Sequence, residues 1–240
     1  FGETKYGDEA DSFFNFDLFK SILMRINPQI LKTIDFSNYR VNLESHAIDC
    51  LDLISKNCPN LTVLNLSGLL KNEKIETYHQ SLVFLIKKCP YIQEIDFSLC
   101  HMNDETLIEI FKNTVHLKSL NFSFCTNING NCFKYLNVDL EKLIMEECLS
   151  IKDEHLFQLL NKNKNSLKHL GLNNKSLSNS IVYLILNCFP NLEILEMRVS
   201  GLESLISTNI KLINEFNLLR NLKTLDLSYS TGDDKLFSFI

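Results

Sequence analysis

The feature that most constrains this chain is a short apolar pattern that returns eight times. In each copy the first, fourth and sixth positions are apolar, and successive copies begin 23 to 31 residues apart. In an extended strand, alternate side chains point to the same side. The fourth and sixth positions are therefore predicted to face a core, and the third, fifth and seventh to face outward. The copies begin at Leu31, Leu61, Ile92, Leu117, Leu140, Leu167, Leu192 and Leu222.

The segments between the copies predict helices. Residues 103–114 begin with Asn and Asp, which are good N-cap residues, and continue with apolar side chains at helical spacing. Residues 43–57 and 152–163 have the same character, whereas residues 129–136 are long enough for only a turn or two. Each proline stands just before a copy of the pattern, where it would end the preceding helix. These prolines are Pro28, Pro59, Pro90 and Pro190.

Parallel strands need a long crossover connection, usually a helix, and a unit of this length is typical of leucine-rich repeats. We therefore predict an α/β leucine-rich-repeat solenoid of about eight repeats. Its curved parallel sheet should line the concave face and its helices the convex face. Residues 31–240 are assigned to the solenoid, and residues 1–30 to an N-terminal segment with a capping half-repeat helix. We expect the solenoid to be truncated at both ends.

The eight cysteines fall largely into two registers of the repeat. Cys100, Cys125 and Cys148 each follow the last apolar strand position by three residues, whereas Cys58 and Cys89 each precede a copy by three. A strand of about 20 Å separates Cys89 from Cys100, and a disulfide needs Cα atoms within about 7 Å. The spacings also differ from those of zinc ligands. We predict buried free thiols, with a redox or metal role as the alternative, and hence a reducing compartment, the cytoplasm or nucleus.

Several classes of function are disfavoured by composition and motifs. The chain carries 24 basic and 29 acidic residues, which gives a formal charge of −5. This balance disfavours binding to the phosphate backbone of nucleic acid. Its apolar runs are too short to span a membrane. It has no glycine-rich phosphate loop, no Gly-x-Ser-x-Gly and no His-Glu-x-x-His motif. We therefore expect a protein that is not an enzyme and needs no cofactor or metal.

Two stretches, "LKSLNFSFCTNINGNCFKYL" (117–136) and "LEKLIMEECLSIKDEHLFQLL" (140–160), combine the apolar pattern with a cysteine and a following helix. "CPNLTVLNLSG" (58–68) and "CPYIQEIDFSLC" (89–100) supply a Cys-Pro before the strand. With these features, residues 31–232 resemble the cysteine-containing leucine-rich-repeat family. That resemblance implies a protein-binding module, as in F-box receptors of cullin-RING ubiquitin ligases. A second branch, similar to antagonist of mitotic exit network proteins, lacks an F-box.

The resemblance leaves the ligase connection open. Residues 1–30 are too short for an F-box, so a cullin ligase adaptor would have to dock through a missing N-terminal module. The alternative is a free-standing scaffold or inhibitor that occludes its partner. A GTPase activator is less favoured, because Arg40 is the only arginine placed to reach a partner's active site.

A protein target is expected on the concave face. There the fifth position is mostly Asp or Asn and the seventh mostly Ser, which suits the turn chemistry of the repeat itself. Repeats five to seven depart from this consensus, and exposed aliphatic and charged side chains there would suit a partner. The alternative is sequence drift on an unused surface. The candidate residues are Lys142, Ile144, Glu146, His169, Gly171, Ile194, Glu196 and Arg198, with Phe124 and Tyr229 just after their strands.

Overall fold

The computed structural model describes residues 15–27, 29–37, 46–70, 75–173, 177–197 and 219–226. Strands and helices alternate along the chain. The helices are α1 Phe16–Arg25, α2 Ala47–Asn57, α3 Ile75–Lys88, α4 Asp104–Phe111, the 3₁₀ helix η1 Asn131–Tyr135, α5 Asp153–Asn163 and α6 Asn179–Cys188. The strands are β1 Thr33–Asp35, β2 Val63–Asn65, β3 Glu94–Asp96, β4 Ser119–Asn121, β5 Lys142–Ile144, β6 His169–Leu172, β7 Ile194–Met197 and β8 Thr224–Asp226.

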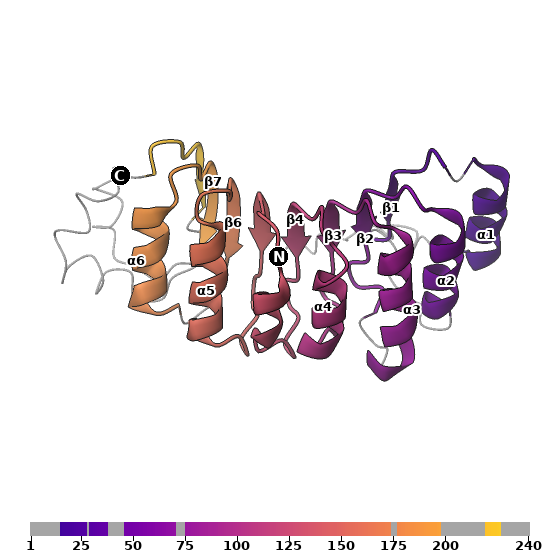
Figure 1. Cartoon of the computed structure of the whole chain (residues 1–240), viewed down its shortest axis with the longest axis horizontal. Coiled ribbons are helices and arrows are strands. Elements are labelled where there is room, and N and C mark those ends of the chain that lie inside the picture. Colours follow the sequence, from indigo (N-terminus) through magenta and orange to yellow (C-terminus); the bar gives the residue numbers. More distant parts are fainter. Residues whose placement is uncertain are drawn as a thin grey trace, which may run out of the picture.

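The eight strands form one parallel sheet in sequence order, β1 to β8. Every pairing aligns the same position of neighbouring repeats, so that Leu64 lies beside Ile95 and Ile95 beside Leu120. Helices form a second layer along the sheet (Figure 1). Strands in a sheet are about 4.8 Å apart, whereas packed helices are 8–10 Å apart, so the sheet takes the concave side. The predicted leucine-rich-repeat solenoid is confirmed.

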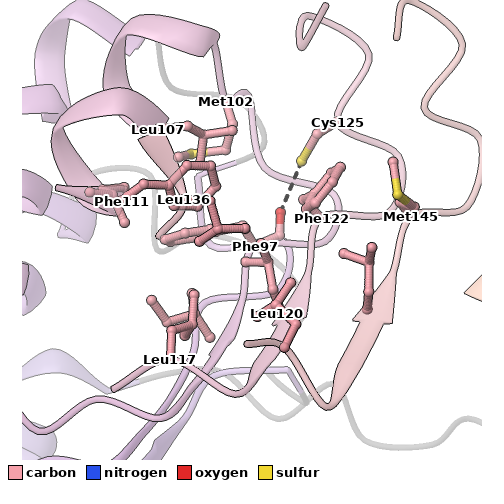
Figure 2. Packing of buried hydrophobic residues seen from close by; sticks show 14 of the residues in the cluster. Phe97, Met102, Leu107, Phe111, Leu117, Leu120, Phe122, Cys125, Leu136 and Met145 are labelled. Carbon is pink, nitrogen blue, oxygen red and sulfur yellow. Dashed lines mark hydrogen bonds between the residues drawn. The ribbon is translucent and has the colours of Figure 1, made fainter. Parts of the chain in front are cut away.

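The predicted inward positions form the core. In the strands from β2 to β7, the fourth and sixth positions of the pattern are at most 2% exposed. Figure 2 shows one section of this core, in which Phe97, Leu120 and Phe122 meet side chains from the helical layer. Full burial of a Leu or Phe side chain contributes roughly 1.5–3 kcal/mol. Repeating the same burial from strand to strand therefore gives a continuous core along the solenoid.

The predicted helices are present, and α4 has the N-terminal cap that its sequence predicts. The Asn103 side chain accepts a hydrogen bond from the Thr106 amide at 2.9 Å, as expected of an N-cap before α4. The helix expected over 43–57 begins at Ala47, and the short segment 129–136 contains only η1. Helix α1 lies within the N-terminal segment, with Leu23 in the core, but the domain boundary at residue 30 stays a prediction.

All eight cysteines are free, and seven of them are buried. The thiols of one register donate to main-chain oxygens of the preceding repeat. Cys100 Sγ donates to Leu66 O at 3.1 Å, and Cys125 Sγ donates to Phe97 O at 3.2 Å (Figure 2). Cys148 Sγ likewise donates to Phe122 O at 3.1 Å. The predicted free thiols are confirmed, and three of them join consecutive repeats by satisfying carbonyl groups at the ends of strands.

Buried polar side chains hold the shortest repeats together. The Asp104 carboxylate accepts hydrogen bonds from the amides of Asn129, Gly130 and Cys132 at 2.7, 3.1 and 2.9 Å. It thereby anchors the start of η1 to the preceding helix. Gly130 has φ +96°, and a Cβ there would lie 2.7 Å from the Cβ of His155. Only glycine fits this turn without displacing its neighbour.

Candidate protein-interaction face

The outward positions of the first four strands stabilise their own turns. The side-chain oxygen of the fifth position accepts a hydrogen bond from the amide of the seventh, which closes an Asx turn. The four pairs are Asp35–Ser37, Asn65–Ser67, Asp96–Ser98 and Asn121–Ser123, at 2.8, 2.9, 2.7 and 3.0 Å. Asn121 Nδ2 also donates to Asp96 Oδ2 at 2.8 Å. In this part of the sheet the polar consensus is therefore structural, as its residue types predict.

The next three strands carry other residue types at the fifth position. Their fifth positions are Ile144, Gly171 and Glu196, which lie side by side in register. Isoleucine and glycine have no side-chain oxygen with which to close an Asx turn. The third positions, Lys142, His169 and Ile194, form a parallel row on the same strands. The sheet thus brings together the predicted residues of repeats five to seven on one face.

Ile144 differs from the prediction. It was expected to be an exposed aliphatic side chain, but it is only 8% exposed. A Cβ on Gly171 would lie 2.8 Å from Ile144 Cδ1, so the isoleucine occupies the space that the glycine leaves empty. The prediction of an exposed Ile144 is wrong. The pattern within one repeat does not show that the small residue Gly171 lies beside Ile144 on the next strand. Ile144 therefore adds little exposed apolar surface to the face.

Three of the polar candidates make contacts across neighbouring strands. His169 Nε2 lies 3.3 Å from Glu196 Oε2, and the two side chains are 20% and 32% exposed. The Glu146 carboxylate accepts a hydrogen bond from Asn173 Nδ2 at 2.8 Å. Lys142 is exposed at the start of β5, and Ile194 is half-buried. This part of the face therefore presents a lysine, an aliphatic side chain and two carboxylates within three neighbouring repeats.

Phe124 reaches the surface, as predicted. It follows β4, is 47% exposed and has φ +62°. Arg198 and Tyr229 lie outside the described residues, as does Arg40.

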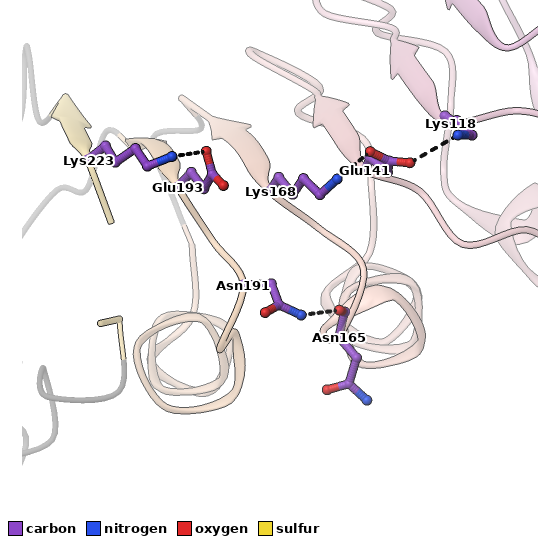
Figure 3. A network of polar contacts seen from close by, with 7 residues as sticks. All are labelled: Lys118, Glu141, Asn165, Lys168, Asn191, Glu193 and Lys223. Atoms are coloured by element: carbon purple, nitrogen blue, oxygen red, sulfur yellow. Dashed lines mark hydrogen bonds and ion pairs between the residues drawn. The ribbon is translucent and has the colours of Figure 1, made fainter. Parts of the chain in front are cut away.

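A row of charged side chains at the second motif position was missed by the sequence analysis. Glu141 accepts a hydrogen bond from Lys168 Nζ at 2.7 Å and lies 3.3 Å from Lys118 Nζ (Figure 3). Lys223 pairs with Glu193 at 2.8 Å. The Lys168 and Lys118 contacts lower the pKa of the Glu141 carboxyl. Reading the second position of each motif in turn would have found this row, because its charges alternate in sign from the fourth repeat to the eighth.

Among the described residues, no three His, Cys, Asp or Glu side chains are grouped closely enough to hold a metal ion. None of the helices in the same part of the chain is long and apolar enough to cross a membrane.

The fold has similar solved structures. No family model matches the chain, and no curated protein matches it. A chain of the yeast Rad7–Elc1 complex is 20% identical, with a TM-score of 0.53, and the match covers 87% of this chain and 44% of that one. This chain thus spans less than half the length of its structural relative.

Two further matches have lower TM-scores. The actin-binding site 2 of leiomodin-1 is 11% identical with a TM-score of 0.36, and the match covers 74% of this chain and 91% of that one. The tropomodulin C-terminal domain of Caenorhabditis elegans is 16% identical with a TM-score of 0.36, with coverage of 75% and 96%. At these identities the likeness to the Rad7–Elc1 chain concerns the fold alone, and the fold is that of a leucine-rich-repeat solenoid.

Proposed function

We propose that this chain is a non-catalytic protein-interaction module that holds a target protein on its concave strand face. We further propose that it forms the substrate-recognition repeats of an F-box-type ubiquitin ligase receptor. The observation that carries the first statement is the change of character at β5–β7. There Ile144 and Gly171 have no side-chain oxygen with which to close an Asx turn, and Lys142, Ile194 and Glu196 lie at outward positions of neighbouring strands.

The rigidity of the sheet supports this role. Each outward side chain of β5–β7 stands on a strand that pairs on both sides, beside inward positions that are almost fully buried. A partner therefore meets side chains whose backbone is already ordered, so little conformational entropy is lost there on binding. A solenoid also offers an extended concave surface, and other proteins of this architecture use such surfaces for binding.

The ligase connection rests on the resemblance of the cysteine-containing repeats to F-box receptors. Under this proposal the strand face holds the target, and an upstream module recruits the cullin adaptor. We also place the protein in the cytoplasm or nucleus, since its eight thiols are unpaired and such compartments keep thiols reduced.

Photo-crosslinking tests the binding face. We would replace Lys142 or Ile194 with benzoylphenylalanine, with Phe157 on α5 as the control, because Phe157 is 40% exposed on the helical layer. Both strand positions should crosslink to the same cellular protein, and the control should not. The double variant Lys142→Glu and Glu196→Lys should lower recovery of that protein at least tenfold. Equal crosslinking from all three positions would contradict the proposed face.

A second measurement separates a ligase receptor from a free-standing scaffold or inhibitor. Affinity purification of the full-length gene product should recover a cullin adaptor together with the crosslinked target. Loss of the gene product should then raise the abundance of the target by slowing its degradation. Capture of the target without an adaptor, and with no change in its abundance, would favour occlusion.

A further inference from the structure

The turns after β2 to β5 share an uncommon backbone conformation. The eighth motif position has positive φ in each of them, and the four residues form what we call the rim: Gly68, Leu99, Phe124 and Glu147, at +72°, +60°, +62° and +52°. Each rim amide donates a hydrogen bond to the seventh-position carbonyl of the next repeat. Leu99 N thus bonds Ser123 O at 2.9 Å, and Phe124 N bonds Glu146 O at 2.7 Å. The rim residues therefore stand in a row along the carboxyl ends of the strands.

Two neighbouring rim positions carry large apolar side chains. Leu99 is 40% exposed and Phe124 is 47% exposed. A bulky residue with positive φ is sterically disfavoured, and glycine adopts the same conformation freely, as Gly68 does in the preceding repeat. Neither the turn nor the core therefore requires leucine or phenylalanine here. Their shared feature is an apolar surface that projects into solvent at adjacent positions.

The surroundings of this pair are acidic. The outward positions of β3 to β5, together with the rim residues that follow them, carry four carboxylates, from Glu94, Asp96, Glu146 and Glu147, against one cation, Lys142. The Asp96 and Glu146 carboxylates accept hydrogen bonds from the neutral amides of Asn121 and Asn173, which leave their negative charge in place. A segment that covers Leu99 and Phe124 thus meets a negative potential on either side.

We propose that Leu99 and Phe124 form a docking site for a segment of a partner protein in which an aliphatic or aromatic side chain stands next to lysine or arginine. The apolar side chain of the partner covers the Leu99–Phe124 pair, and its basic neighbours lie near Asp96, Glu146 and Glu147. The inference rests on the proposed protein-binding function and specifies the chemistry of the target at one edge of the same face.

Peptide selection tests the docking site directly. A phage library of random twelve-residue peptides would be selected on the whole 240-residue chain, and the best peptide titrated by fluorescence anisotropy. Enriched peptides should pair Leu, Phe, Tyr or Trp with Lys or Arg. The double variant Leu99→Gly and Phe124→Gly should bind at least tenfold more weakly, and Phe157→Ala should bind like the wild type. Higher salt should weaken the wild-type complex by screening the carboxylates.

The glycine variants carry their own control for folding. Because glycine adopts positive φ without a steric cost, their melting temperature should equal or exceed that of the wild type. Enrichment of acidic peptides, equal binding by the double glycine variant, or no enrichment at all would overturn the proposal. Loss of peptide binding together with a lower melting temperature would also overturn it, since the two residues would then be structural.

The outcomes distinguish this inference from the wider proposal. A target that crosslinks at Lys142 and Ile194 but binds the double glycine variant normally would refute the rim site alone. Absence of any strand-face crosslink would refute the proposed function, whereas the peptide titration would still report on the rim.

Discussion

The strands β1–β4 and β5–β7 share one sheet and one core but use their outward positions differently. In the first group, Asp or Asn at the fifth position closes a turn onto the following serine amide. In the second group, the fifth position holds Ile144, Gly171 and Glu196. Where the consensus is kept, the polar outward side chains stabilise the turns of the repeat. Where it is lost, Ile144 and Gly171 cannot close such a turn, and the outward side chains can take another role.

Alkaline pH should give the largest difference between the two groups. Burial raises the pKa of Cys58 to about 11 and that of Cys89, Cys100 and Cys148 to about 12, against 9.0 for an ordinary thiol. Because the folded pKa is the higher one, this stabilisation is complete below about pH 9 and is lost as the pH rises towards 12. Each such thiol should lower the free energy of unfolding by about 1 kcal/mol per pH unit above 9. The four together should lower it by several kcal/mol at pH 10.

The effect should be concentrated in the N-terminal repeats. Six of the seven buried cysteines precede β5 and the seventh, Cys148, follows it, whereas Cys188 in α6 is only half-buried. Pulsed alkylation at pH 8 and pH 10, followed by peptide mass spectrometry, should show the thiols of the early repeats becoming reactive together. A stability that does not change between pH 8 and pH 10 would contradict the assignment of these thiols to a sealed core.

A substitution at Gly171 should have the next largest effect. Gly171→Val places side-chain atoms where Ile144 now lies, and overpacking of this kind costs about 1–3 kcal/mol. Adding Ile144→Ala to Gly171→Val should recover part of that loss, because the smaller residue reopens the space. Urea denaturation of the two single variants and the double variant measures this coupling. Strict additivity of the free energies would show that the two residues do not share the site.

The smallest expected effect comes from truncating a fifth-position side chain to alanine in each group. Asn121→Ala removes the acceptor for the Ser123 amide and hydroxyl and the donor to Asp96, which should cost about 1–2 kcal/mol. Glu196→Ala removes a partly exposed pairing with His169 and should cost less than about 0.5 kcal/mol. Thermal melts of the two variants make the comparison. A larger loss from Glu196→Ala would mean that the second group also uses its outward positions for stability.

Much of the fold could be predicted from the repeat alone. The apolar positions set which side chains face the core, and every strand pairing joins equivalent positions, as Leu120 with Leu143 and Leu143 with Leu170. The free cysteines followed from a strand too long for Cys89 to reach Cys100. The candidate face was less predictable, since the exposure of Ile144 depends on the size of a neighbour 27 positions further along the chain.

The sequence by itself determined the period of the repeat, the inward positions and the departure from consensus in repeats five to seven. These features depend on spacing within one repeat, which the order of residues displays directly. Only the tertiary structure decided that Ile144 fills the space beside Gly171, that Glu141 lies between Lys118 and Lys168, and that Leu99 and Phe124 share one edge. Such contacts join residues about 25 positions apart, and the parallel register of the strands makes them neighbours.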